Sequence, residues 1–157
     1  MPETVPGKVL AALKGRKFSA LGKLFAPKCD FQAWTPSGRW VAEDGATVAK
    51  IAEVWFSPGA GTGTVMWSTE TSSAKAATLE YEITWKAPPD DSPRVLRDAW
   101  MMSLKDGRIT AVRVYSAGLH IEFPEVDLEK QRRQKGLAGV KMSNSPKVIT
   151  SKAPQTA

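Results

Sequence analysis

The amino-acid sequence predicts an α+β domain whose N-terminal helices cover one face of a curved sheet. Two observations support this fold class. Residues 78–120 show the two-residue alternation of three consecutive strands, and the preceding segments carry apolar residues at helical spacing. The chain has 157 residues, a length that suits one domain with a core large enough to enclose a cavity.

The strand pattern is clearest in residues 78–87, where every second residue is apolar. Such alternation is typical of a strand with one buried and one solvated face. Residues 94–104 and 108–118 continue the pattern, and Asp106-Gly107 between them is a strong hairpin signal. The three strands are therefore expected to pair as an antiparallel meander. The apolar residues of the first strand are Leu79, Tyr81, Ile83 and Trp85.

An acidic residue falls on the apolar side of the second strand. Asp98 shares its side with Leu96, Trp100, Met102 and Leu104. The alternation therefore predicts a carboxyl group among apolar neighbours.

Two helices are predicted before the first strand. One begins at Gly7 and is interrupted by Gly15, and the next is capped by Ser19 and ends at Pro27. Each has an apolar stripe that a sheet could cover. The stripes consist of Val9, Leu10 and Leu13, and of Leu21, Leu24 and Phe25.

A third helix begins at Asp44-Gly45 and is stopped by residues 57–59. Its apolar face must be buried. Short strands are predicted at 29–34 and 65–70, and residues 39–41 either continue the first of these or begin a small hairpin. The apolar face of the helix consists of Val48, Ile51, Ala52 and Trp55.

Composition excludes several classes of function. The formal charge is +6, but residues 121–157 hold seven Lys/Arg against four acids, so the rest is only mildly basic and nucleic-acid binding is not predicted. Cys29 and His120 are the only residues of their kinds, which argues against a disulfide or a transition-metal site, and no cofactor is predicted. No leader and no long apolar run is seen, so no membrane association is expected and a cytoplasmic location is predicted.

Three segments are predicted: an N-terminal arm at 1–6, the domain at 7–123 and a basic tail at 124–157. Prolines and glycines interrupt the tail, which holds at most one basic helix. The tail is either a loosely attached extension or a partner-binding or subunit-clasping one.

The order of helices and strands resembles the NTF2-like superfamily, and in particular its SnoaL-like members. The resemblance covers residues 7–120 and is carried by Phe25-Ala26-Pro27, Gly45-Ala46 and Asp106-Gly107-Arg108-Ile109. It implies a cone formed by a curved mixed or antiparallel sheet wrapped around three helices, and a homodimer through the outer face of the sheet. The superfamily includes isomerases, cyclases, dehydratases, epoxide hydrolases and non-catalytic modules, so the fold alone assigns no reaction.

The sequence departs from the family pattern at two acid/base positions. Isomerase-like members carry a carboxylate where this chain has Trp34 and Thr35, and cyclase-like and hydrolase-like members often carry an Asp near Val114. Neither position here can exchange a proton. The acid that the isomerase branch has in the penultimate strand matches either Asp98 or Ala99, which lie on opposite faces.

Asp98 and His120 are the candidate catalytic residues. A buried Asp98 would have a raised pKa and could donate a proton or a hydrogen bond, although it could instead pair with Arg94, Arg97 or Arg113, or be exposed at a strand end. His120 follows the last strand and could act as a general base, although a histidine there is also typical of a surface or capping residue.

Aromatic residues are candidates for the walls of an apolar pocket. The chain has six tryptophans, which either line a ligand cavity or belong to the core or a dimer interface, and the two tyrosines either point a hydroxyl inward or pack. The candidate substrate-binding residues are Trp34, Trp55, Trp67, Trp85, Trp100, Met102, Tyr81 and Tyr115.

The leading hypothesis is a small-molecule pocket protein, an isomerase, cyclase or dehydratase that transfers protons on a hydrophobic polyketide- or terpenoid-like substrate. The alternative is a non-catalytic ligand-binding or protein-assembly module of the same fold. A third possibility is an adaptor that acts through the basic tail. Loss of turnover with unchanged ligand affinity in Asp98 variants would separate the first two.

Overall fold

The computed structural model describes residues 3–57, 63–87 and 92–121, which form three helices and six strands. The predicted basic tail, 124–157, lies outside the described residues. The helices are α1 (Val5–Lys14), α2 (Phe18–Gly22) and α3 (Gly45–Phe56). The strands are β1 (Phe25–Thr35), β2 (Gly38–Ala42), β3 (Thr64–Ser72), β4 (Ala76–Ala87), β5 (Ser92–Lys105) and β6 (Arg108–Ile121).

Helix α1 begins two residues before Gly7, the predicted start. The Thr4 hydroxyl accepts a hydrogen bond from the Gly7 N–H at 3.0 Å and so caps the helix. Pro6 fits in the first turn, where backbone N–H groups have no partner within the helix. The chain at Val5 and Pro6 is therefore helical.

Helix α2 differs from its prediction at both ends. It begins at Phe18 without a side-chain cap, so the predicted capping role of Ser19 is wrong; the Phe18 ring lies 5.9 Å from the Phe56 ring of α3. It ends at Gly22 and not at Pro27. There the backbones of α2 and α3 approach so closely that a Cβ on Gly45 would overlap the Gly22 carbonyl. Only glycine fits this helix contact.

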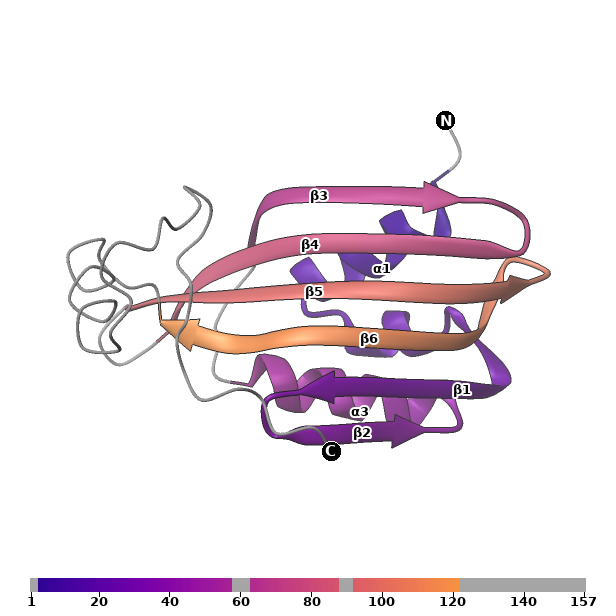
Figure 1. Cartoon of the computed structure of the whole chain (residues 1–157), viewed down its shortest axis with the longest axis horizontal. Coiled ribbons are helices and arrows are strands. Elements are labelled where there is room, and N and C mark those ends of the chain that lie inside the picture. The colour runs from indigo at the N-terminus through magenta and orange to yellow at the C-terminus, as the bar shows by residue number, and fades with distance from the viewer. Residues whose placement is uncertain (1–2, 58–62, 88–91, 122–157) are drawn as a thin grey trace, which may run out of the picture.

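The six strands form one mixed sheet in the order β2-β1-β6-β5-β4-β3 (Figure 1). Neighbours are antiparallel except β1 and β6, which are parallel. The predicted meander of β4, β5 and β6 is therefore confirmed. At its second turn Asp106 and Gly107 have φ angles of 52° and 75°, the left-handed pair typical of a two-residue hairpin turn.

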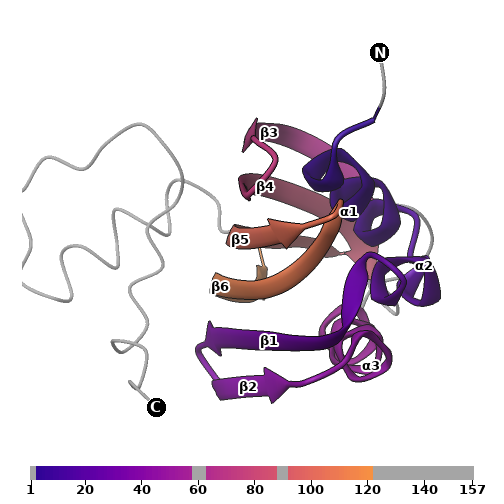
Figure 2. The same ribbon diagram turned by 90° about the vertical axis from the view of Figure 1, so that its right-hand side faces the viewer.

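The helices all lie on one side of the curved sheet, and the core fills the space between the two layers (Figure 2). This arrangement confirms the predicted α+β cone. Asp44 caps α3 by accepting a hydrogen bond from Thr47 N–H at 2.7 Å, as expected for the predicted start of this helix. The buried face of α3 consists of Val48, Ile51, Ala52 and Phe56.

The other face of the sheet, here called the outer face, carries charged and exposed apolar side chains. Arg97 pairs with Glu82 at 2.5 Å and Arg113 pairs with Asp30 at 2.9 Å. Exposed apolar side chains on this face include Trp67, Met101 and Tyr115.

Candidate functional site

A hydrogen-bonded cluster of polar side chains lies inside the cone, at the centre of the sheet. The Tyr81 hydroxyl donates to Oδ2 of Asp98 at 2.5 Å, and the Trp100 indole Nε1–H donates to the Tyr81 oxygen at 3.3 Å. Asp98 is 3% exposed and is the only charged residue that is buried in the described part of the chain. The predicted position of Asp98 among apolar neighbours is confirmed.

Strand register brings these groups together. Tyr81 of β4 lies directly opposite Asp98 of β5, so their side chains project on the same face as neighbours. Trp100 follows Asp98 by two residues and therefore shares that face. Three of the predicted alternatives for Asp98 fail, because Arg97 and Arg113 form ion pairs with other acids on the outer face and because Asp98 is buried.

A β-bulge adjoins the cluster. Asp98 pairs with Ser116 and Leu96 pairs with Leu119, so two residues of β6, Ala117 and Gly118, lie opposite the single residue Arg97. Gly118 has a φ of 81°, and its N–H donates to the Ser116 hydroxyl oxygen at 3.0 Å. Sequence reasoning missed Ser116 and this bulge. A glycine inside a strand pattern is the signal that could have revealed them.

The buried environment raises the pKa of both Asp98 and Tyr81. Burial raises the pKa of Asp98 from 3.8 to about 6, although hydrogen bonding by Ser116, Tyr81 and Trp100 acts in the opposite direction. Burial and the nearby Asp98 charge raise the pKa of Tyr81 well above 10. Near neutral pH Asp98 can therefore both release and accept a proton, whereas Tyr81 stays a neutral donor.

One oxygen of Asp98 has no hydrogen-bond partner among the described residues. Oδ2 accepts the Tyr81 hydrogen bond, whereas Oδ1 is buried and unpaired. The indole N–H groups of Trp55 and Trp85 are also buried and find no acceptor in the part of the chain that the structure describes. Aromatic rings lie beside the cluster: the Phe31 ring lies 6.1 Å from the Trp100 ring and 6.1 Å from the Trp55 ring.

The predicted wall residues divide between the two faces of the sheet. Tyr81, Trp85, Trp100 and Met102 lie on the same inner face of the sheet as Asp98. Trp55 packs against the core from α3. Trp34, Trp67 and Tyr115 lie on the outer face, away from Asp98, which is the position that the sequence left open as an alternative.

The physical reason is strand geometry. Trp34 and Tyr115 are paired across β1 and β6, and their ring centroids lie 5.3 Å apart. Each follows a buried residue, Ala33 or Val114, by one position and therefore projects on the opposite face of the sheet. A bulge between Val65 and Trp67 turns Trp67 outward, where its indole donates to Glu82 at 3.2 Å.

The remaining predicted catalytic residue, His120, has its backbone in β6 opposite Val95 of β5. Its side chain lies outside the described residues. The positions at which the resemblance expected an acid are occupied by structural groups. The Thr35 hydroxyl accepts from the Trp40 indole at 3.1 Å and donates to the Gly38 carbonyl at 3.0 Å, and Val114 is fully buried.

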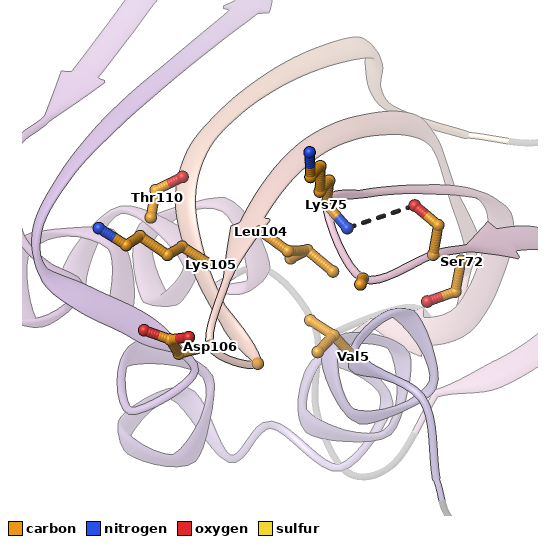
Figure 3. A pocket seen from close by; sticks show the side chains of 10 residues that line it. Val5, Ser72, Lys75, Leu104, Lys105, Asp106 and Thr110 are labelled. Carbon is orange, nitrogen blue, oxygen red and sulfur yellow. Dashed lines mark hydrogen bonds between the residues drawn. The ribbon is translucent and has the colours of Figure 1, made fainter.

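An open pocket of about 730 Å³ lies away from this cluster, between two hairpin turns and the start of α1 (Figure 3). Val5 and Leu104 form its apolar part, and Lys75, Lys105 and Asp106 lie around it. None of its lining residues belongs to the Asp98 cluster. Within the described ranges, no three His, Cys, Asp or Glu residues are grouped as metal ligands. No helix there is long and apolar enough to cross a membrane.

A curved mixed sheet covered on one face by three helices is the NTF2-like, ketosteroid isomerase-like fold, and comparison with solved structures agrees. A hypothetical protein of ketosteroid isomerase-like fold from Catenulispora acidiphila, in complex with trimethylamine, is similar with a TM-score of 0.59 and 16% identity over 72% of this chain and 85% of that one. A Mycobacterium tuberculosis LEH-like epoxide hydrolase gives a TM-score of 0.52 and 15% identity over 71% and 79% of the two chains.

An NTF2-like protein of unknown function from Cytophaga hutchinsonii is similar with a TM-score of 0.52 and 11% identity, over 73% of this chain and 97% of that one. No protein-family model matches the sequence, and no curated protein matches it either. At these identities the comparisons show the fold alone.

Proposed function

We propose that the protein binds a small apolar molecule inside the cone and acts on it by acid/base proton transfer through Asp98. The observation that carries this proposal is the unpaired Oδ1 of a buried carboxyl whose other oxygen is held by Tyr81. Buried polar atoms in proteins are nearly always satisfied, so an unpaired carboxyl oxygen is typical of a site that meets a substrate.

The chemistry follows from the pKa. With a pKa of about 6, Asp98 is mostly ionised at neutral pH and regains a proton readily. Ionised Oδ1 could take a proton from a carbon next to a carbonyl group and return it to another position, which moves a double bond without net loss of atoms. Tyr81, as a neutral donor, stabilises the carboxylate. Alternatively, protonated Asp98 donates to a developing oxyanion while His120 is the base.

Proton abstraction can be measured without knowledge of the substrate. Wild type, Asp98→Asn and Tyr81→Phe proteins would be incubated in D₂O with a panel of cyclic ketones, and deuterium uptake next to the carbonyl followed by mass spectrometry. We expect Asp98→Asn to slow exchange by roughly 100-fold or more, the scale of general acid–base catalysis. Asp30→Asn, which changes an acid on the outer face, is the matched control and should exchange at the wild-type rate.

Wild-type exchange by Asp98→Asn would refute the proton-transfer role. Absence of exchange in the wild type as well, combined with retention of a small molecule in native mass spectrometry, would favour the second candidate. That candidate is a ligand-binding or assembly module without catalysis. It is supported by the two positions where enzymes of similar fold carry acids. In this chain they are occupied by Thr35, which bonds within a turn, and by Val114, which belongs to the core.

The proposal includes a homodimer formed through the outer face. This face carries half-exposed Met101 and Tyr115 near its centre, beside two ion pairs. In a twofold dimer, a charged residue of these pairs could instead bind the opposite charge of the other subunit. Cytoplasmic location is proposed with it, consistent with the buried free thiol of Cys29.

A further inference from the structure

The open pocket at the β3–β4 and β5–β6 turns has no part in the proposed proton transfer. The two turns lie side by side at one end of the sheet (Figure 1). Asp98 pairs with Tyr81 in the middle of β4 and β5, whereas the Ser103–Ala76 pair lies beside the pocket, five residues further along β5. The volume of about 730 Å³ is within the range of roughly 300–1,000 Å³ that ligand pockets occupy. The pocket is therefore a candidate site apart from the Asp98 cluster.

Hydrogen bonds hold the walls of this pocket in place. Within the β3–β4 turn the Ser73 hydroxyl accepts from the Lys75 N–H at 3.3 Å. The Leu104 N–H donates to the Lys75 carbonyl at 2.8 Å, which joins the turn to β5. The Thr4 hydroxyl donates to the Glu70 carboxylate at 2.5 Å and so ties the start of α1 to β3. Because these walls are already ordered, a ligand pays little entropy to order them.

The charged groups around the pocket have no ion-pair partner of their own. Lys75 and Lys105 extend on either side of Leu104, and Asp106 lies at the β5–β6 turn (Figure 3). None of these three charges forms an ion pair within the described residues. Two lysines against one aspartate give the lining a net charge of +1. The lining therefore favours an anion over a cation.

Apolar side chains complete the lining. Leu104 is 8% exposed and belongs to the core, and Val5 packs against the core from the first turn of α1. An inorganic anion would leave the apolar part of the pocket in contact with water, and a hydrocarbon would leave both ammonium groups without a counter-charge. A molecule with an anionic head and an apolar tail matches both parts.

We propose that this pocket binds a small amphipathic carboxylate, whose charged head meets Lys75 and Lys105 and whose apolar tail contacts Val5 and Leu104. Asp106 restricts the head to a single negative charge, because it repels a second one. A phosphate monoester, with a charge of about −1.5 to −2 at neutral pH, is therefore disfavoured. The site goes beyond the proposed function and requires neither Asp98 nor turnover.

Two probes that differ in the charge of the head test the proposal: octanoate and its neutral amide, octanamide. Calorimetry would give both affinities for wild type, Lys75→Gln and Lys105→Gln. The control is Lys86→Gln, which changes an exposed lysine near the other end of β4. We expect wild type to prefer octanoate. Each pocket variant should lose roughly 2- to 5-fold in octanoate affinity, the value of one exposed ion pair, and keep its octanamide affinity.

Asp106→Asn tests the same site by a gain of affinity. Asp106 has a φ of 52°, which Asn also adopts, so the turn is retained. Removal of the negative charge should raise octanoate affinity by roughly 2- to 5-fold. Butanoate should bind the wild type roughly 10-fold or more weakly than octanoate, because its shorter tail buries fewer methylene groups.

The wild type also locates the ligand without any variant. In ¹⁵N-labelled protein, octanoate should shift the amide resonances of Gly107 and Thr110, which line the pocket. Shifts at Tyr81 and Asp98 without shifts at Gly107 and Thr110 would place the ligand elsewhere and overturn the proposal. Equal affinity for octanoate and octanamide, including no binding of either, would also overturn it. So would an octanoate affinity that neither lysine substitution lowers, that Asp106→Asn does not raise, or that butanoate equals.

Discussion

At the scale of single residues, the most consequential feature is a carboxyl group whose ionisation opposes folding. Asp98 ionises near pH 3.8 when exposed but near pH 6 when buried, so the folded state holds its proton more tightly than the unfolded state does. Between these two pKa values stability therefore falls as pH rises. The penalty is absent below pH 3.8 and complete above about pH 6.

Asp98→Asn should remove this penalty. A shift from 3.8 to about 6 corresponds to about 3 kcal/mol, because one pKa unit is worth about 1.4 kcal/mol. We expect the unfolding free energy of Asp98→Asn, relative to wild type, to rise by that order from pH 4 to pH 7, since Asn keeps an acceptor for Tyr81. Chemical denaturation across this pH range measures the difference. A difference that stays constant with pH would show that Asp98 has an ordinary pKa.

The pH range of any proton transfer depends on the same group. If ionised Asp98 is the base, deuterium exchange should rise with pH and level off above about pH 6. The profile would be measured with the most reactive ketone of the panel. A rate that falls through this range would instead assign the protonated form of Asp98 as the active one.

At the scale of elements, the bulge in β6 links the shape of the sheet to the site. Gly118 has a positive φ, which other residues adopt only with strain, and a Cβ there would lie 2.8 Å from Cγ of Pro36. The Gly118 N–H also holds the Ser116 hydroxyl, which favours the charged form of Asp98. The bulge therefore helps to set the proton affinity of the carboxyl.

We expect Gly118→Ala to destabilise the fold by about 1–3 kcal/mol, through backbone strain and the contact with Pro36. Gly38→Ala is the matched control. Gly38 also has a positive φ, of 134°, but a Cβ there would meet nothing within 4 Å. Denaturant unfolding of both variants, with infrared titration of the Asp98 carboxyl, checks the effect. Equal stability losses in both variants would mean that the contact with Pro36 contributes nothing.

At the scale of the whole molecule, the sheet has two different faces. One buries the core beneath the helices, whereas the outer face exposes 42% of Trp67, 54% of Met101 and 51% of Tyr115 beside its ion pairs. Trp, Tyr, Met and Arg are the residue types enriched at protein interfaces. The proposed homodimer would bury this face.

Met101→Glu should convert the proposed dimer to a monomer, because it places a charge at the centre of the buried face. Val54→Glu is the control. Val54 is also 54% exposed but lies on α3, in the helical layer, so its variant should remain dimeric. Light scattering during size-exclusion chromatography measures the mass. A monomeric wild type, or a dimeric Met101→Glu protein, would contradict the proposed interface.

Much of the fold could be predicted because its signals are local. The alternation around Leu79 and Trp100 assigned the buried face of β4 and β5, and Asp106-Gly107 predicted the turn that the structure contains. Asp98 was placed inside for the same reason. The side of Trp67 could not be predicted, because a bulge reverses the side on which a residue projects and leaves little trace in the sequence.

By itself, the sequence determined the order of elements, the meander and the side of the sheet on which Asp98 lies, since these depend on neighbours within a few residues. Only the tertiary structure decided that Tyr81 and Trp100 form a hydrogen-bonded chain to Asp98 and that the bulge places Ser116 beside it. It also decided that Oδ1 of Asp98 and two indole N–H groups have no partner within the described ranges. These features depend on strand register and helix packing, which join residues far apart in the chain.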